Sequence, residues 1–242
     1  MGTRGSAGII YEEKIYATYN HFDSYPDGLG GDVVKFINAV QSKKSIKELV
    51  IENEKSLLGK IATKKLLDEF LQRKQYLEIL NNSQYSSIVG FGGWTQLAEN
   101  LKKVQEIDVN VPPTKEIQDK YQNLGYCNLG VSTQSPKEWY CLLRETQGID
   151  TFAEIYKGNL EHISNDKDFF KDSLYCEWGY LINLDTMKFE VYEGFQKTPQ
   201  KGNRFGEESN ENGYYSCALV AEFELENIPP DWEKEILPEE NE

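Results

Sequence analysis

Histidine is nearly missing from this chain, which has only 2 in 242 residues. Imidazole is the side chain best suited to proton transfer near neutral pH, so the positions of His21 and His162 are informative. Cysteine is also sparse, and the spacing of the 4 cysteines includes no Cys-x-x-Cys pair. Because they lie in apolar segments, we expect reduced core residues rather than disulfides or zinc ligands, and we predict no metal site.

Basic residues are outnumbered by acidic ones, and long apolar runs are lacking. The chain has 26 basic and 40 acidic residues, which gives a net charge of −14. This charge repels phosphate backbones and anionic lipids, so nucleic acid and membrane surfaces are poor partners. No run approaches the roughly 20 apolar residues of a membrane span, and no apolar leader opens the chain. We therefore expect a cytoplasmic protein, and no motif predicts a cofactor.

What the sequence does contain begins with an N-terminal β-hairpin. Apolar residues alternate on both sides of Glu12-Glu13, which predicts two short strands joined by a tight turn. With that turn, paired residue numbers sum to 25 and Arg4 lies opposite His21, within diagonal reach of Asp23. A loop one residue longer or shorter would turn the Arg4 side chain to the other face of the sheet relative to His21, but Arg4 would still lie beside the same segment.

The rest of the chain reads as a helical middle followed by further strands. Apolar residues alternate again over 178–191 and 215–225, whereas much of the segment between the two strand-rich ends has helical spacing. Ser-Pro-Lys-Glu predicts a capped helix over 136–147. We predict a single α+β domain whose mixed or antiparallel sheet joins the N-terminal hairpin to the C-terminal strands. Residues 43–130 form a helical insertion, and 236–242 form an acidic tail.

The candidate site is the loop that follows the hairpin, Tyr-Asn-His-Phe-Asp-Ser-Tyr-Pro-Asp-Gly-Leu-Gly-Gly at 19–31. Loops with this composition often position chemistry or a ligand. We assign His21 as general base and Asp23 as its orienting carboxylate, with Arg4, Asn20 and Tyr25 binding the ligand. Arg4 would clamp a carboxylate or phosphate.

A structural interpretation of the same loop stays open. Asp23 would accept hydrogen bonds from turn amides, while Gly28, Gly30 and Gly31 would admit positive φ before the next helix. The second histidine, His162, could pair with a cysteine thiol, but its pattern is more typical of an ordinary core or surface residue.

Several blocks of the chain resemble a family of uncharacterised proteins from giant viruses, fungi, protists and bacteria or their phages. The blocks are GTRG at 2–5, YNHFDSYPDGLG at 19–30, LLRETQG at 142–148, CEWGYLINLD at 176–185 and EVYEGFQ at 190–196. They cover both ends of the chain, while 43–130 carries little of the resemblance. The family has no assigned activity, so the resemblance implies only that these blocks belong to one unit.

Three functions follow as hypotheses. The first is a ligand-binding or protein-interaction protein with a polar pocket beside the N-terminal hairpin, whose partner is a small anionic ligand or another protein. The second is a hydrolase or transferase that uses the cluster of His21, Asp23 and Arg4. The third is a protein that self-assembles through tyrosine-rich sheet edges, which leaves a homo-oligomer open. A concave pocket favours the first two, and free strand edges favour the third.

Overall fold

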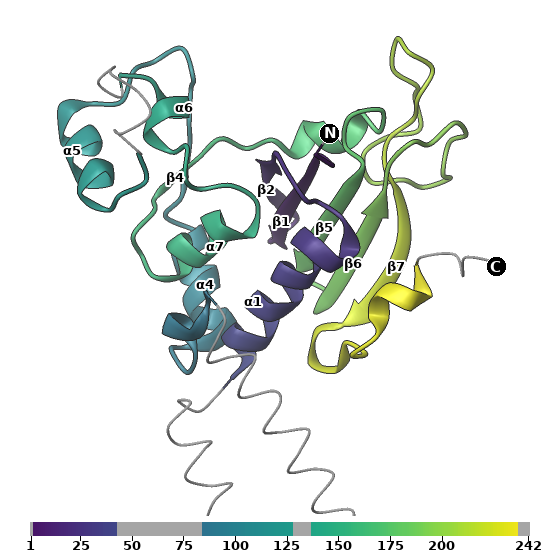
Figure 1. The fold of residues 1–242 in the computed structure, drawn as a ribbon, viewed down its shortest axis with the longest axis horizontal. Helices are drawn as coiled ribbons and strands as arrows, with labels where there is room; N and C mark the ends of the chain where they lie inside the picture. Colours follow the sequence, from purple (N-terminus) through teal and green to yellow (C-terminus); the bar gives the residue numbers. More distant parts are fainter. Residues whose placement is uncertain (1, 43–83, 128–136, 237–242) are drawn as a thin grey trace, which may run out of the picture.

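A five-stranded mixed sheet forms the centre of the computed structural model, which describes residues 2–42, 84–127 and 137–236 (Figure 1). Its strands are β1 (Gly5–Tyr11), β2 (Lys14–Asn20), β5 (Trp178–Asn183), β6 (Lys188–Glu193) and β7 (Ala218–Glu224), in the order β2-β1-β5-β6-β7. β1 and β5 are parallel, and the other neighbours are antiparallel. The predicted α+β fold, with a sheet built from both ends of the chain, is confirmed.

The hairpin has the predicted register. Gly5 pairs with Asn20, so paired numbers sum to 25, and the ladder ends at this pair, one residue before Arg4 and His21. Glu12 and Glu13 have φ values of 51° and 62°. Positive φ at both turn residues matches the right-handed twist of the strands that they join, which explains the two-residue turn.

Helices and short turns complete the described chain. The α-helices are α1 (Gly31–Gln41), α4 (Gly93–Leu101), α5 (Lys115–Asn123), α6 (Trp139–Leu142) and α7 (Ile149–Tyr156). Short helical turns are η1 (Pro26–Gly30), η2 (Ser86–Ile88), η3 (Lys167–Lys171), η4 (Leu225–Asn227) and η5 (Trp232–Glu235). A second, two-stranded parallel sheet pairs β3 (Gln105–Glu106) with β4 (His162–Ile163). None of the helices in the described ranges has the length and apolarity to cross a bilayer.

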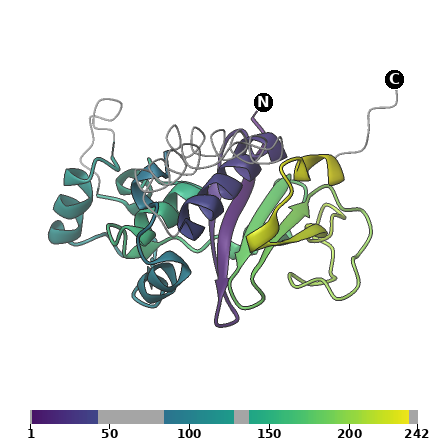
Figure 2. The same cartoon turned by 90° about the horizontal axis from the view of Figure 1, so that it is seen from below.

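Both faces of the large sheet are buried. On one face, Ile9, Tyr180 and Phe189 join the apolar side of α1, and η5 adds Trp232. Figure 2 shows α1 and the C-terminal turn on the same side of the sheet. The opposite face carries a smaller cluster that includes Phe170 of η3. All four cysteines are free, and Cys176 and Cys217 are buried in this smaller cluster.

The helix predicted over 136–147 is wrong in extent. Its only α-helical part in the described chain is α6, and turns follow from Leu143. The backbone groups that would continue the helix bind elsewhere: Glu145 N donates to Tyr126 O and Gly148 N donates to Tyr19 O. These bonds to distant segments replace the helical ladder.

Some predictions fall outside the described residues. These include the Ser135 cap, residues 43–83 of the helical insertion, and nearly all of the acidic tail at 236–242. The division of the chain into one domain with an insertion stays a prediction.

Glycines in the loop after β2 are required by close packing rather than by positive φ. A Cβ at Gly28 would lie 2.1 Å from the carbonyl oxygen of Asp23, and one at Gly30 would lie 2.8 Å from the Trp232 ring. Gly30 and Gly31 have φ values of −59° and −60°. The expected positive φ at these glycines is therefore wrong, and Asp23 itself has a φ of 52°.

Candidate functional site

A cavity of about 350 Å³ lies beside β2, the outer strand of the sheet on the hairpin side. We call it the β2 pocket, and it is lined by residues of β2, by 21–22, and by parts of 107–109, 139–151 and 160–166. Figure 1 shows α6, β4 and α7 on the side of the sheet that β2 borders. Both histidines of the chain, 141 positions apart, line this one cavity.

The pocket wall closes the free edge of β2. Asn165 Oδ1 accepts from Ala17 N at 3.1 Å, and Asp166 N donates to Ala17 O at 2.8 Å. Further along the strand, Gly148 N donates to Tyr19 O at 3.1 Å. These bonds satisfy backbone groups that an edge strand otherwise leaves open, and they hold the pocket segments against the sheet.

His21 reaches the pocket from the end of β2. Its Nδ1 lies 2.7 Å from the Tyr19 hydroxyl, and its backbone N donates to Gln147 Oε1 at 3.2 Å. The ring also packs edge-on against Phe22, with centroids 4.2 Å apart. Among the described residues, the orienting partner of this imidazole is Tyr19 and not the predicted Asp23.

His162 reaches the pocket from β4. Its Nδ1 lies 2.6 Å from the Tyr121 hydroxyl, which also accepts from Glu161 N at 3.1 Å. Because a hydroxyl can accept a second hydrogen bond or donate one, this contact fits either tautomer of the neutral ring. Burial lowers the pKa of His162, Lys120 adds to the effect and Glu161 opposes it. The ring packs against Trp139 at a tilt of 34°, with centroids 5.1 Å apart.

Two polar residues from other elements, Asp166 and Thr151, also line the pocket. Asp166 Oδ2 accepts from Tyr19 N at 3.2 Å, and burial raises the pKa of this carboxyl. Thr151, in the first turn of α7, is only 2% exposed. Its hydroxyl has no hydrogen-bond partner within the part of the chain that the structure describes.

A cation and an exposed aromatic ring stand at the pocket rim. Arg144 is exposed, its guanidinium carbon lies 5.0 Å from the Tyr140 ring centroid, and it donates to the Tyr140 hydroxyl. Tyr140 is 70% exposed. Exposed aromatic surface beside a cation is a suitable contact for an aromatic ligand with a negative charge.

The other predicted site residues lie outside the pocket lining. Arg4 stacks on Tyr175, 4.8 Å from the ring centroid, although its charge still opposes the rise that burial causes in the pKa of Tyr19. Asn20 braces the loop by donating to Ser24 Oγ at 2.9 Å.

The last two members of the predicted cluster, Asp23 and Tyr25, are both exposed. Their side chains are absent from the β2 pocket, so the structure places only His21 of the predicted cluster on it.

Sequence reasoning missed His162, Thr151 and Arg144 as members of one site. Arg144 and Thr151 flank the short turn that ends at Gly148, and His162 belongs to a two-residue strand too short to have a period. No strong sequence pattern links these three residues, because only the tertiary fold brings their segments to β2.

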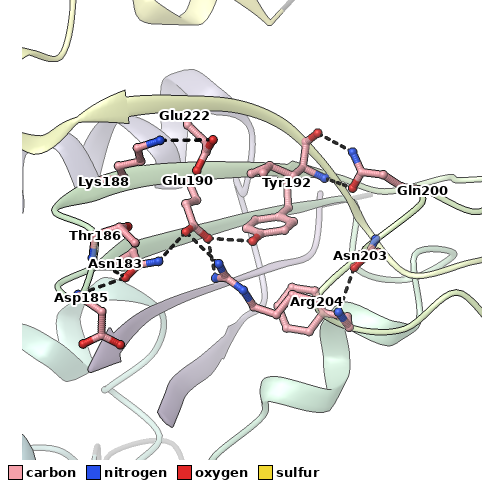
Figure 3. Close-up of polar contacts among 12 residues, drawn as sticks. Asn183, Asp185, Thr186, Lys188, Glu190, Tyr192, Gln200, Asn203, Arg204 and Glu222 are labelled. Atoms are coloured by element: carbon pink, nitrogen blue, oxygen red, sulfur yellow. Dashed lines mark hydrogen bonds and ion pairs between the residues drawn. The ribbon is translucent and has the colours of Figure 1, made fainter. Parts of the chain in front are cut away.

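A second polar cluster joins β5, β6 and the 196–213 loop and is internally satisfied (Figure 3). Glu190, 1% exposed on β6, receives two hydrogen bonds from Arg204, at 2.6 and 3.0 Å. Tyr192 and Asn183 each donate to it at 2.7 Å. Because every oxygen has partners, we interpret this cluster as a structural clamp on the 196–213 loop.

Within the described ranges, no group of three or more His, Cys, Asp or Glu side chains has the arrangement of a metal site. Comparisons with protein-family models, with curated proteins and with solved structures found no match to this chain. The resemblance noted above therefore stays a prediction, and function has to be argued from the β2 pocket alone.

Proposed function

We propose that this protein binds a small aromatic anion in the β2 pocket. The observation that carries the proposal is the convergence of both histidines, an exposed arginine and an aromatic wall on one cavity of about 350 Å³. That volume is at the small end of the range for ligand sites, which suits a molecule of one or two rings.

The wall favours an aromatic body. Trp139, Phe22 and Tyr140 present rings to the cavity, and Leu143 and Ile163 add aliphatic surface. Apolar walls with a few placed polar groups are typical of small-molecule sites.

The rim favours a negative charge on the ligand. The protein as a whole repels anions, so an anionic ligand needs a local cation, and Arg144 supplies one. Asp166 also lines the pocket and its carboxylate opposes this preference, although Tyr19 N and Ser164 Oγ donate to it and burial raises its pKa.

Binding can be tested with 2-naphthoate, a two-ring carboxylate. We expect saturable one-to-one binding, and we expect Arg144→Gln to weaken it about tenfold through loss of a charge-assisted hydrogen bond. Lys201→Gln, in the distant 196–213 loop, makes the same change in net charge and should leave binding unaltered. Wild-type protein that binds no 2-naphthoate would contradict the proposal.

Arg4→Gln decides between this pocket and the site predicted from the sequence. If Arg4→Gln abolishes binding and Arg144→Gln does not, the ligand sits at the N-terminal cluster instead. Native mass spectrometry of protein purified from its own host would then identify the natural ligand by mass.

The two other functions, an enzyme and a self-assembling protein, have less support from the structure and remain hypotheses. A hydrolase or transferase would use His21 oriented by Tyr19, since Asp23 is not its partner among the described residues. Self-assembly through sheet edges is less favoured because Asn165, Asp166 and Gly148 occupy the edge of β2.

A further inference from the structure

The second border of the large sheet is strand β7, which lies at the end opposite to β2 in the strand order (Figure 1). Gln200 closes the beginning of this edge, because its Oε1 accepts from Leu219 N and its Nε2 donates to Leu219 O, each at 2.9 Å (Figure 3). The ladder to β6 then skips Val220, which is exposed. Beyond this bulge, no side chain of the described residues closes the edge in the same way.

The backbone groups that face outward on β7 follow from the ladder. Leu225 N donates to Met187 O at 3.0 Å, so the backbone of Leu225 faces β6. Because residues of an antiparallel strand turn their N–H and C=O alternately toward and away from the neighbouring strand, Phe223 also faces β6, whereas Glu222 and Glu224 face outward. No residue in the described ranges forms a hydrogen bond with the outward groups of these two glutamates. β7 therefore offers a short row of free donors and acceptors to another strand.

The side chains along this edge are acidic. Glu222, Glu224 and Glu226 are exposed, and residues 218–226 include no basic side chain. Lys188 Nζ lies 3.5 Å from Glu222 Oε2, but none of the ion pairs in the described part of the chain involves Glu224 or Glu226. The edge therefore carries a local negative charge, which the net charge of −14 reinforces.

This charge decides which strand can pair with β7. A second copy of the chain would set the glutamates of one β7 against those of the other, and like charges directly opposite each other destabilise a pair of strands. Residues 237–242 carry three glutamates and no basic residue, so the edge repels them in the same way. The bulge and the glutamates disfavour copies of this protein and leave a basic strand as the partner that charge favours.

We infer that β7 binds an extended segment of another protein, which adds a sixth strand to the sheet and carries Lys or Arg at alternate positions. Recognition of this kind draws its affinity from backbone hydrogen bonds and its specificity from alternate side chains. Glu222 and Glu224 project from one face of β7, whereas Phe223 projects from the other face and packs against Trp232. The partner segment therefore has basic residues on one face and apolar residues on the other. This surface is separate from the β2 pocket and does not depend on the proposed function.

A fluorescently labelled peptide of alternating lysine and valine has this pattern and serves as the probe. Fluorescence anisotropy at low ionic strength should show saturable one-to-one binding of the peptide to the wild-type protein. Two N-methylated versions keep every lysine charge but lose the backbone donors of either the valines or the lysines. Because only one of these two sets faces β7 in a paired strand, one version should lose binding and the other should retain it.

Protein variants test the contribution of the charges. Glu222→Gln combined with Glu224→Gln should weaken binding of the unmethylated peptide about fivefold, through loss of two exposed charge contacts. Glu116→Gln combined with Glu138→Gln makes the same change in net charge at exposed positions of α5 and beside α6, which Figure 1 shows far from β7. This control should bind the peptide like the wild type.

Amide hydrogen exchange, followed by NMR, locates the bound peptide. In the free protein, the amides of Glu222 and Glu224 should exchange faster than those of Ala221 and Phe223, which bond to β6, and the peptide should slow the exchange of both glutamates. A wild-type protein that binds no peptide, or glutamate amides that gain no protection, would overturn the inference. Equal affinity for the two N-methylated peptides would also overturn it, because attraction between charges would then act without strand pairing.

Discussion

The buried ion pair between Glu190 and Arg204 should respond unequally to loss of either partner. Glu190 is 1% exposed, whereas the Arg204 side chain is 35% exposed. Arg204→Met keeps most of the aliphatic stem and leaves a buried carboxylate with only Tyr192 and Asn183 as donors. Breaking a buried pair in this way costs about 3–5 kcal/mol, and the two remaining donors place the expected loss at about 3 kcal/mol.

Replacing Glu190 should lower the free energy of unfolding by less than replacing Arg204. Glu190→Gln removes the charge and leaves the guanidinium unpaired, but Arg204 is exposed enough to reach water, so we expect a loss of about 1–2 kcal/mol. The double variant should be more stable than Arg204→Met alone, because it no longer buries an uncompensated charge.

Urea denaturation followed by circular dichroism measures these three free energies of unfolding. If Arg204→Met lies within about 0.5 kcal/mol of the wild type, the clamp does not contribute as described. A greater loss for Glu190→Gln than for Arg204→Met would show that the burial of the carboxylate is not the controlling factor.

Three further predictions concern the hairpin, the loop after it and the pH dependence of stability. Replacing Glu12 and Glu13 by Asn-Gly should stabilise the protein by about 1 kcal/mol in urea denaturation, because both positions have positive φ; an equal or lower stability would contradict this reason. Gly28→Ala should lower the thermal midpoint sharply, since its Cβ would lie 2.1 Å from Asp23 O, and an unchanged midpoint would count against that packing. The folded state lowers the pKa of His162 below its usual 6.5, so the unfolded state binds more protons and stability should decrease as pH falls through 6.5. His162→Gln should flatten this part of the pH profile of unfolding free energy, and an unaltered slope would assign the effect to other groups.

The sequence predicted the sheet well because its strands alternate and its hairpin turn admits one simple register. Gly5 opposite Asn20 follows from the position of Glu12-Glu13 alone. The prediction of a helix over 136–147 failed because long-range contacts outweigh the local pattern there. Its local signals favour a helix, but Glu145 and Gly148 donate to Tyr126 and Tyr19, partners that no local pattern reveals.

The candidate site was predictable only in part. His21 follows directly from a polar loop next to a strand, and it does line a pocket. The hairpin register, which is correct, predicts Arg4 beside this loop, yet the Arg4 side chain lies over Tyr175 from the distant C-terminal half. His162 and Thr151 reach the pocket through long-range packing, and the sequence around each resembles ordinary core.

The two histidines give the most direct measurement of whether the β2 pocket is a binding site. Protein with ¹⁵N-labelled histidine rings yields signals from 2 side chains only, and His21→Gln assigns them. Because both rings line one cavity, titration with 2-naphthoate should shift the signals of both with the same apparent Kd. Signals that stay unmoved at saturating probe, or a shift confined to His21, would contradict a ligand site formed jointly by β2 and β4.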